Sequence, residues 1–528
     1  MKILISDPLS DEGIKILKEV KDFEVDIKTG LRPEELMAII KDYDALIVRS
    51  ATKVTKEIIG AATNLKAIGR AGVGLDNVDL EAATKRGIMV MNTPAGNTIS
   101  TAEHAMSLLL AVARNIPQAH QSTKAGEWKR SKFMGTELYN KTLGIIGLGR
   151  IGAEVAKRAF AFGMRVLAYD PFISLEVAKQ LGVEVVTDLK DLLSCADFIT
   201  IHAPLTEETR NLISDKEFAL MKKDSYVINC ARGGIIDEAA LGRALEENKI
   251  AGCALDVYEK EPPEGSPLLK CYGCVMTPHL GASTEEAQVN VAIEIAEVIR
   301  DALTGKGIRN AANFPSIEAS VHKILAPYID LSEKMGLFAS QLVEGRLNSA
   351  KITYCGILAQ QKTTQPLTMA FVKGLLTPIL QETVNFINAI DLAKERGINV
   401  QESKSTTEEE YVNLIIVELG TDKGKIQVSG TLFSNKEPRI VKIDEYYLEA
   451  VPEGYMLVTN NLDRPGIIGA LGTILGKNNI NIAGMTFGRD VPGGKAMSII
   501  NVDSTVSAAV LSEIRKFPNI LGVKLVKL

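Results

Sequence analysis

The sequence of 528 residues predicts an α/β protein in which two doubly wound parallel sheets precede two smaller α+β units. From residue 1 to about residue 300, apolar strand-like runs alternate with helical patterns, which is typical of β-α-β units. A glycine-rich turn follows the strand-like run that ends at Ile146. From residue 455 onward the pattern changes to β-α-β-β-α-β, the order of a ferredoxin-like unit.

The glycine-rich turn has the spacing G-x-G-x-x-G at Gly147, Gly149 and Gly152. Gly147 permits a tight turn, Gly149 lets the backbone approach a pyrophosphate, and Gly152 lets the next helix pack against its strand. The following apolar run ends in Asp170, where such folds place the acceptor for the ribose hydroxyls. An aspartate there would repel the 2′-phosphate of NADP, so the sequence predicts a Rossmann-type site for NAD.

A second glycine-rich segment, Gly69–Asp76, has the different spacing G-x-x-G-x-G. The strand expected after it ends at Asn92 rather than at an acid, so an ordinary turn is the simpler interpretation. The NAD unit is therefore expected to be the second of the two sheets, with one α/β unit before it.

The strands expected in these two sheets are short apolar runs. They are Lys2–Ser6, Ala45–Val48, Ala67–Gly69, Met89–Asn92, Thr142–Ile146, Arg165–Tyr169, Phe198–His202, Tyr226–Asn229, Cys253–Val257 and Val275–Thr277. A helix expected over Ile99–Ala113 leads from the first sheet to the second, and one over Thr284–Leu303 leads back. The second domain is thus expected to be inserted into the first, with the active site in the cleft between them.

Breaks in the pattern near residues 304–315 and 451–454 divide the rest of the chain. We therefore expect a discontinuous substrate-binding domain (1–98 and 284–313), an NAD-binding domain (99–283), an intervening domain (314–452) and a terminal domain (453–528). Strands are expected at Asn413–Leu419 and Lys425–Thr431 of the intervening domain, which contains no recognisable catalytic motif.

Composition excludes several classes of function. A net charge of −5 gives no electrostatic footprint for nucleic acid, and the apolar stretches are too short for a membrane span. No secretory leader pattern opens the chain, so a cytoplasmic protein is expected. Six cysteines in this length do not form a disulfide framework, and the pair Cys271 and Cys274 lacks the partners of a zinc site. No metal is therefore expected.

Removing a proton from a substrate alcohol requires a base with a pKa near neutrality, which directs attention to the five histidines. Three of them, His104, His120 and His322, lie in helical or motif-poor segments and are expected to be structural. His202 ends a strand and is expected to border the cofactor. His279 follows a strand of the second sheet at its carboxyl end, where open α/β sheets bind ligands.

Two further side chains lie beyond neighbouring strand ends. Glu261 can hydrogen-bond an imidazole, fix its tautomer and raise its pKa. The planar fork of Arg232 can hold a carboxylate and polarise the neighbouring oxygen. Each residue alone is as often structural as catalytic, but Arg232, Glu261 and His279 in this order after a dinucleotide turn indicate hydride transfer.

These segments resemble the D-isomer-specific 2-hydroxyacid dehydrogenase family. The segments are Gly147–Gly152, Cys230–Gly233, Asp256–Pro262 and Pro278–Ala282. Val48–Thr52, Gly69–Asn77, Trp128–Leu138 and the chain length are similar to the D-3-phosphoglycerate dehydrogenase branch. That resemblance implies a flavodoxin-like substrate domain, an inserted Rossmann domain, an intervening domain and a C-terminal ACT domain.

The resemblance implies NAD-dependent oxidation of 3-phospho-D-glycerate to 3-phosphohydroxypyruvate, the first step of L-serine biosynthesis. It makes His279 the acid/base, Glu261 its partner and Arg232 the group that binds the substrate carboxylate and reacting oxygen. The implied cofactor contacts are Gly147, Gly149, Arg150, Ile151, Gly152, Asp170, Cys230, Ala231, Arg232, Asp256, His279, Gly281 and Ala282. The implied substrate contacts are Arg49, Ser50, Arg70, Gly72, Val73, Gly74, Arg232 and His279.

Asp463 and Asn481 of the ACT-like unit are candidates for binding L-serine as a feedback inhibitor across a subunit interface, and the family is typically a homotetramer. A purely oligomerising ACT-like unit is the alternative. Two other functions remain open: a reductase for another 2-oxoacid, such as hydroxypyruvate, glyoxylate or 2-oxoglutarate, and an NADH-sensing interaction protein.

Overall fold

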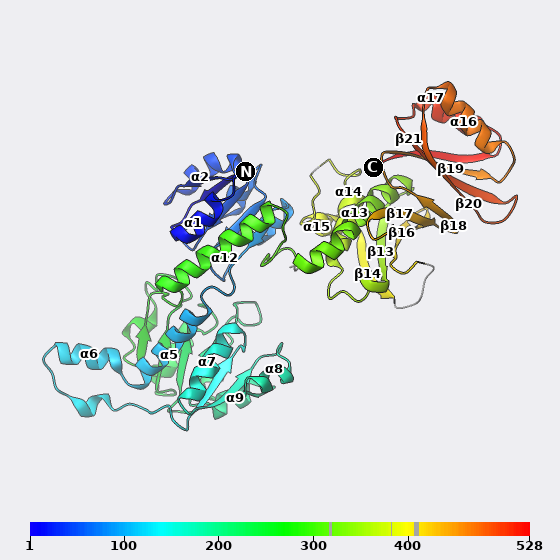
Figure 1. The fold of residues 1–528 in the computed structure, drawn as a ribbon. Helices are drawn as coiled ribbons and strands as arrows, with labels where there is room; N and C mark the ends of the chain where they lie inside the picture. Colours follow the sequence, from blue (N-terminus) through cyan, green and yellow to red (C-terminus); the bar gives the residue numbers. More distant parts are fainter. Residues whose placement is uncertain (316–318, 382, 406–410) are drawn as a thin grey trace.

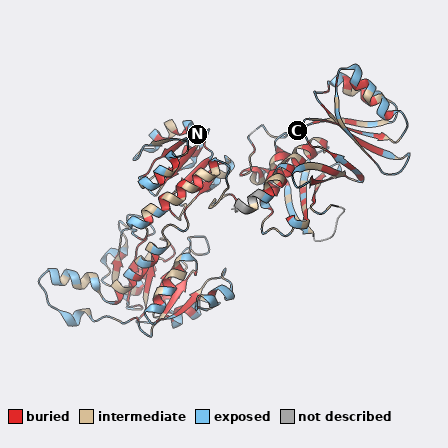
Figure 2. Cartoon of the chain, viewed as in Figure 1, coloured by how far each residue is buried: buried red, intermediate tan, exposed pale blue. Residues whose placement is uncertain are grey.

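The computed structural model describes residues 1–315, 319–381, 383–405 and 411–528, except for the side chains of residues 319, 320, 322 and 323, so that of His322 lies outside them. Four β-sheets follow one another along the chain (Figure 1). The strands and the inner faces of the helices carry the buried residues, while the outer helix faces are exposed (Figure 2). Among the described residues, no helix is long and apolar enough to cross a membrane.

The first sheet is parallel, with the order β2-β1-β3-β4-β5. Its strands are β1 (Lys2–Ile5), β2 (Glu24–Ile27), β3 (Ala45–Val48), β4 (Ala67–Arg70) and β5 (Met89–Met91). Helices α1 (Asp11–Lys18), α2 (Pro33–Ile39), α3 (Lys56–Ala61) and α4 (Leu80–Lys85), with the short turn η1 (Ile40–Asp42), connect them. This is the flavodoxin-like strand order, so the expected doubly wound unit is confirmed.

The second sheet is parallel, with the order β12-β11-β10-β9-β6-β7-β8. Its strands are β6 (Thr142–Ile146), β7 (Arg165–Tyr169), β8 (Glu184–Val185), β9 (Phe198–Ile201), β10 (Tyr226–Asn229), β11 (Gly252–Leu255) and β12 (Cys274–Met276). Its helices and turns are α6 (Ile116–Lys124), η2 (Arg130–Phe133), α7 (Arg150–Ala161), α8 (Leu175–Gln180), α9 (Leu189–Cys195), α10 (Asp215–Phe218), α11 (Glu238–Glu246) and η3 (Pro267–Lys270). Strand order reverses between β6 and β9, as in a Rossmann fold.

Two helices join these sheets. Helix α5 (Thr98–Ala113) leaves the first unit and packs against α7 and β10 of the second. Helix α12 (Glu285–Leu303) returns and packs against α1 and β4 of the first. Figure 1 shows both helices at the junction of the two units. The chain therefore crosses between the units twice, at the side of the cleft.

Two strands of these sheets were not expected from the sequence. Strand β2 lies at the edge of the first sheet, where Val25 and Asp26 are half-buried and the residues on either side of them are exposed. Strand β8 has two residues at the edge of the second sheet. Edge strands need little apolar surface, so their sequence pattern is weak.

The third sheet has the order β14-β13-β15-β16-β17-β18 and is antiparallel except between β13 and β14. Its strands are β13 (Leu347–Cys355), β14 (Asn399–Ser405), β15 (Ile415–Thr421), β16 (Gly424–Phe433), β17 (Glu437–Ile443) and β18 (Tyr446–Ala450). The accompanying helices are α13 (Ala319–Leu342), η4 (Gly356–Leu358), α14 (Gln365–Leu376) and α15 (Ala389–Glu395). Helices α13 and α14 pack together over a continuous apolar core.

The fourth sheet is antiparallel, with the order β20-β21-β19-β22. Its elements are β19 (Tyr455–Leu462), α16 (Ile467–Lys477), β20 (Ile482–Arg489), β21 (Lys495–Val502), α17 (Ala508–Lys516) and β22 (Ile520–Lys527). Helices α16 and α17 lie on one face (Figure 1). The expected ferredoxin-like unit is therefore confirmed.

Candidate active site

A cavity of about 380 Å³ lies between the first two units, beyond the carboxyl ends of their strands. Gly74 and Asp76 line it from the segment after β4. Arg232, Asp256 and His279 line it from the segments after β10, β11 and β12. The structure therefore brings together side chains from both units at the position where open α/β sheets bind ligands.

His279 and Glu261 form a direct pair in this cleft. The His279 Nδ1 atom lies 2.8 Å from Glu261 Oε2. This hydrogen bond raises the pKa of His279; burial works in the opposite direction but does not cancel it. Burial alone would raise the pKa of Glu261, but the hydrogen bond and charge of His279, together with the Tyr258 N–H, outweigh it and lower that pKa. The pair is therefore built to stabilise a protonated imidazole beside a carboxylate.

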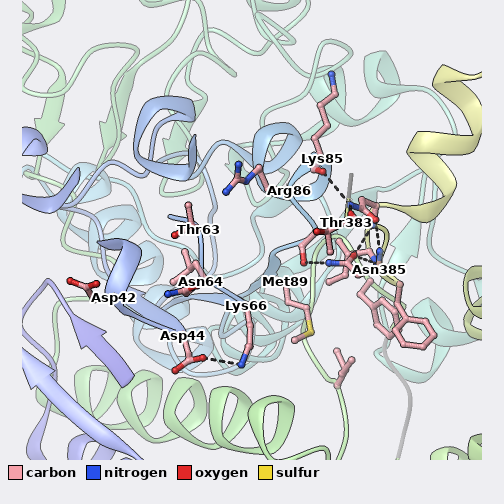
Figure 3. A pocket seen from close by; sticks show the side chains of 17 residues that line it. Asp42, Asp44, Thr63, Asn64, Lys66, Lys85, Arg86, Met89, Thr383 and Asn385 are labelled. Carbon is pink, nitrogen blue, oxygen red and sulfur yellow. Dashed lines mark hydrogen bonds and ion pairs between the residues drawn. The ribbon is translucent and has the colours of Figure 1, made fainter. Parts of the chain in front are cut away.

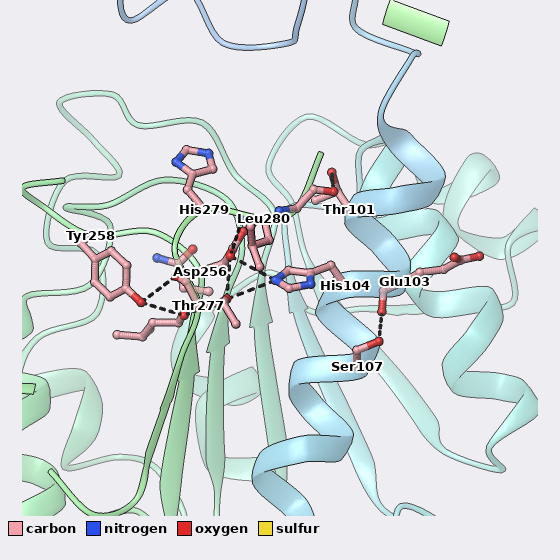
Figure 4. A network of polar contacts seen from close by, with 12 residues as sticks. Thr101, Glu103, His104, Ser107, Asp256, Tyr258, Thr277, His279 and Leu280 are labelled. Carbon is pink, nitrogen blue, oxygen red and sulfur yellow. Dashed lines mark hydrogen bonds and ion pairs between the residues drawn. The ribbon is translucent and has the colours of Figure 1, made fainter. Parts of the chain in front are cut away.

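The turn that carries His279 is fastened to Asp256. The Asp256 carboxylate accepts hydrogen bonds from the Thr277 hydroxyl at 2.6 Å, the Leu280 N–H at 2.7 Å and the Gly281 N–H at 2.8 Å. Burial would raise the pKa of Asp256, but hydrogen bonds, including one from His104, keep it below its ordinary value. The side chains of this network are drawn in Figure 4. An ionised, buried carboxylate thus holds the Thr277 side chain before His279 and the backbone after it.

Arg232 crosses the cleft to the first unit. Its Nε donates to Asp76 Oδ2 at 3.1 Å, and its Nη1 donates to the Ala231 carbonyl at 2.7 Å. A side chain at Gly74 would collide with the Arg232 guanidinium, so the glycine makes room for it. The guanidinium is therefore held from its Nε side at the wall of the cleft.

Beside the cleft, Arg70 stands close to Arg232 and to Arg49. Neither Arg49 nor Arg70 is among the residues that line the cavity. The Nε atom of each is buried and has no hydrogen-bond partner among the described residues. Burial, with a further contribution from Arg232, lowers the pKa of Arg70 to about 10. Burial also lowers the pKa of Arg49, which Asp7 partly offsets. Two guanidinium groups with unsatisfied Nε donors, together with that of Arg232, favour a bound anion.

Two residues that sequence reasoning missed shape this anion site. Asp7 follows β1 and accepts from the Arg49 N–H at 2.6 Å and the Thr52 hydroxyl at 2.7 Å, so it anchors the loop that carries Arg49 and exposed Ser50. Asn97 lines the cleft, and its buried Oδ1 has no partner among the described residues. Asp7 could have been recognised in the sequence as a polar residue just past a strand end, whereas no sequence pattern marks Asn97.

The glycine turn fits a dinucleotide. Gly147 has φ 91°, and a Cβ there would lie 2.7 Å from the His202 carbonyl oxygen. No atom lies within 4 Å of the position of a Cβ on Gly149, which leaves its backbone open to a ligand. Asp170 Oδ2 accepts from the Leu148 N–H at 2.8 Å, so the acid stands beside the turn. These observations match a bare-backbone phosphate site with an adjacent ribose acceptor.

The other residues expected to contact cofactor or substrate differ in their position and in whether their polar groups are already engaged. Those lining the cleft include Val73, Ile151, Cys230, Ala231, Gly281 and Ala282, while Arg150 begins α7. The Gly72 N–H donates to the Arg70 carbonyl at 2.9 Å, so it is already engaged. His202 also lines the cleft, and burial lowers its pKa to about 4, which keeps its ring neutral.

Asp463 and Asn481 do not meet within one chain. Asp463 accepts from the Arg489 guanidinium at 3.1 Å and the Gly493 N–H at 3.0 Å, near the start of β21. Asn481 donates to Asp503 at 2.6 Å, beyond the end of β21. The two residues thus lie at opposite ends of the fourth sheet, and one ligand could contact both only between two copies of the chain.

A second cavity, of about 900 Å³, lies between the first and third units (Figure 3). Lys66, Lys85 and Arg86 line it from the first unit, and Asn385 and Phe386 line it from the third. Asn385 Nδ2 donates to the Gly87 carbonyl at 2.8 Å, which joins the two units directly. None of the expected catalytic residues is among those that line this cavity.

Three segments of the chain match described families. Residues 106–281 match the NAD-binding domain of the D-isomer specific 2-hydroxyacid dehydrogenases. Residues 324–444 match the D-3-phosphoglycerate dehydrogenase intervening domain, and residues 455–519 match the ACT domain. All three matches fall on separate sheets of the fold.

Full-length relatives agree with these matches. The chain is 49% identical to a D-3-phosphoglycerate dehydrogenase of Methanocaldococcus jannaschii, with 100% of both chains covered. It is 42% identical to that of Bacillus subtilis, covering 100% of this chain and 99% of the relative. Among solved structures, D-lactate dehydrogenase from Aquifex aeolicus, complexed with NAD and lactic acid, matches at TM-score 0.54 and 30% identity. That match covers 60% of this chain and 100% of the other.

Proposed function

This chain belongs to the D-3-phosphoglycerate dehydrogenases of the D-isomer-specific 2-hydroxyacid dehydrogenase family, and we propose that it oxidises 3-phospho-D-glycerate to 3-phosphohydroxypyruvate with NAD. The reaction is the first step of L-serine biosynthesis. The observation that carries the proposal is the His279–Glu261 pair at a cleft lined by Arg232, with Arg70 close enough to Arg232 for their charges to repel each other.

His279 is the acid/base of the proposed reaction. Bound NAD supplies the acceptor for the hydride that leaves the carbinol carbon. Because its Nδ1–H donates a hydrogen bond to Glu261, His279 takes the hydroxyl proton on its other ring nitrogen, Nε2. Glu261 stabilises the imidazolium that forms, in line with the raised pKa of His279. In the reverse direction the same imidazolium returns the proton to the carbonyl oxygen.

The cations match a substrate that bears two anionic groups. Arg232, held at Nε by Asp76, uses its Nη edge for the substrate carboxylate and the reacting oxygen. Arg49 and Arg70, with Ser50 on the adjoining loop, bind the phosphate end. The N–H groups of Val73 and Gly74 donate to no backbone carbonyl among the described residues and are available to the carboxylate. Gly72 contributes shape alone, because its own N–H is engaged.

The NAD contacts follow the glycine turn and the strand ends. Gly147, Gly149, Arg150, Ile151 and Gly152 form the turn and the start of α7 under the pyrophosphate, and Asp170 accepts from the ribose hydroxyls. The residues assigned to the nicotinamide end are Cys230, Ala231, Arg232, Asp256, His279, Gly281 and Ala282. A dissociation constant for NADH and for NADPH, measured by fluorescence, tests this arrangement; tighter binding of NADPH would contradict the role of Asp170.

Steady-state kinetics distinguish this reaction from a reductase acting on another 2-oxoacid. Purified protein is assayed with NAD and 3-phosphoglycerate, glycerate or 2-hydroxyglutarate. Three cations at the cleft favour the phosphorylated substrate, for which we expect kcat/KM at least about tenfold higher, because one charged hydrogen bond contributes about 1.5–3 kcal/mol. Equal values would favour the general reductase. No turnover with any substrate, together with retained NADH binding, would favour an NADH-sensing protein.

L-Serine is the proposed feedback inhibitor, bound between two copies of the ACT unit. Support comes from the match to the ACT domain and from Asp463 and Asn481, a carboxylate for an ammonium and an amide for a carboxylate. Inhibition by L-serine is measured against glycine, on the wild type and on Asp463→Ala, with Asp490→Ala as a nearby control. An uninhibited wild type would leave the unit an oligomerising module.

A homo-oligomer, with a tetramer as the specific proposal, accounts for exposed apolar side chains between α6 and β6. Trp128, Met134 and Tyr139 are 78%, 82% and 66% exposed, and α6 buries none of its own residues (Figure 2). Large exposed apolar patches mark interaction sites. Light scattering of Trp128→Glu with Met134→Glu tests this; an unchanged mass would reject this arm as an interface. A phosphorylated substrate and free cysteines such as Cys195 and Cys271 support a cytoplasmic location.

A further inference from the structure

We infer that His104, on the helix that connects the first two units, positions the catalytic turn by donating a hydrogen bond to Asp256. The inference rests on the proposed reaction and adds a residue to it. His104 is not among the residues that line the cleft, so it acts through Asp256 and is a positioning residue.

One face of α5 lies against the segment that carries His279. Ser100 Oγ lies 2.7 Å from Thr284 Oγ1, and the Thr101 hydroxyl donates to the Gly281 carbonyl at 3.1 Å. One turn further along, His104 Nε2 lies 3.1 Å from Asp256 Oδ1 and 3.2 Å from Thr277 Oγ1. Side chains three and four residues apart share a helix face, so these three contacts form one continuous seam.

The Asp256 carboxylate is the centre of this seam. Asp256 is 1% exposed, and three of its hydrogen bonds come from Thr277, Leu280 and Gly281, which flank His279 in the sequence. Among the described residues, His104 is the one hydrogen-bond donor to this carboxylate from outside the segment Thr277–Gly281 (Figure 4). Its removal would leave a buried carboxylate short of a partner, which is costly. His104 therefore ties the catalytic turn to the connecting helix.

The conformation of His279 makes this tie consequential. His279 has φ 57°, in the left-handed region that a non-glycine residue rarely adopts without support. The support is the pair of hydrogen bonds from the next two N–H groups to Asp256. If Asp256 shifts, His279 moves relative to Glu261 and to the substrate hydroxyl. A displacement of about 1 Å can lower turnover by as much as about 10²-fold, whereas binding depends on many other contacts.

The test compares His104→Leu with His104→Gln in the full-length protein. Leucine preserves much of the side-chain volume without a donor, while glutamine restores an N–H donor. For His104→Leu we expect kcat about tenfold lower, with KM for 3-phosphoglycerate and the dissociation constant of NADH within about twofold of wild type. For His104→Gln we expect kcat within about threefold of wild type. Ser107→Ala, whose hydroxyl donates to the Glu103 carbonyl on the same helix, is the matched control.

Thermal unfolding is measured for every variant. Wild-type kcat in His104→Leu would overturn the inference, as would a loss equal in both His104 variants, since that loss would reflect ring packing rather than the hydrogen bond. A loss confined to NADH binding would also overturn it. A wild-type protein that does not oxidise 3-phosphoglycerate would instead reject the proposed function, so the two failures are distinguishable.

Discussion

The cleft between the first two units and the cavity between the first and third units differ in how their polar groups are satisfied. In the larger cavity, of about 900 Å³, Lys66 pairs with Asp44 at 2.9 Å and Lys85 pairs with Glu81 at 3.1 Å. Asn385 donates to the Gly87 carbonyl across the junction (Figure 3). These polar side chains are therefore already paired, with one another or with a backbone carbonyl.

In the smaller cleft, of about 380 Å³, polar atoms lack partners. They are Arg49 Nε, Arg70 Nε, Asn97 Oδ1 and His202 Nδ1, all buried in or beside the cleft. A buried polar atom without a hydrogen bond is costly, so it persists where a ligand supplies the missing contact. Such atoms also occur elsewhere among the described residues, but none belongs to a residue that lines the larger cavity. They therefore distinguish the cleft from this larger space between packed units better than volume does.

The substitution His279→Ala should have the largest effect. It removes the acid/base, whose contribution is typically 10²- to 10⁴-fold, so kcat should fall by about that factor. The dissociation constant of NADH should change little, because the glycine turn and Asp170 remain. Stopped-flow or steady-state rates with 3-phosphoglycerate check this, with His120→Ala on exposed α6 as the control. Turnover near the wild-type rate would show that the reaction takes place at some other site.

Arg70→Met separates binding from stability. We expect KM for 3-phosphoglycerate to rise about 10- to 100-fold, because a charged hydrogen bond is lost. We expect the free energy of unfolding to increase by about 1 kcal/mol, because a buried guanidinium repelled by Arg232 is removed. Urea denaturation and steady-state kinetics measure the two effects. Lys66→Met in the larger cavity is the control and should leave KM unchanged; an unchanged KM in Arg70→Met would contradict the anion site.

Glu261→Gln tests the His279 pair through its pH dependence. Glu261 raises the pKa of His279, so the amide should let that pKa fall. Oxidation needs the neutral imidazole, and its rate rises with pH through this pKa; the acid limb of kcat/KM should therefore move to lower pH. The plateau rate should fall by about tenfold, because the imidazolium loses its carboxylate. A limb that stays in place would show that His279 is not the titrating base.

Asn385→Ala should have the smallest kinetic effect. It removes the hydrogen bond to Gly87 that joins the first and third units and two bonds that its Oδ1 accepts from nearby backbone N–H groups, so the free energy of unfolding should fall by about 1–3 kcal/mol. Both kcat and KM should stay within about twofold of wild type. Calorimetry and steady-state assays check this against Asn64→Ala, which loses a bond to Lys41 within the first unit. A large change in kcat would show that the larger cavity communicates with the cleft.

Most of the strands were predictable from the sequence, and the exceptions have a common cause. The expected strands of the two parallel sheets appear within about two residues at each end, because buried parallel strands are nearly continuous apolar runs. Residues such as Asn92, His202 and Thr277 lie just past the observed strand ends, since the chain leaves the sheet there. Edge strands β2 and β8, and four strands of the third sheet, were not expected, because polar residues interrupt or replace the apolar run in most of them.

The residues of the site also fall into those that were recognisable from the sequence and those that were not. Gly147, Asp170, Arg232, Glu261 and His279 were recognisable because each occupies a strand end or a turn with a distinctive local pattern. The hydrogen bonds of Asp7 and His104 join segments that are distant in sequence, and no local pattern reports such contacts. Asn97 is likewise placed at the cleft only by the folding of the chain.

By itself, the sequence determined the order of the sheets and the residues at the ends of their strands, because burial periodicity, glycine turns and acidic strand ends are local properties. Only the tertiary structure decided which charges face one another. It placed Arg232 against Asp76, left the Nε atoms of Arg49 and Arg70 without acceptors, and set His104 on Asp256. Electrostatic interactions act through space between segments that the chain topology brings together, so their outcome is fixed when the two units close around the cleft.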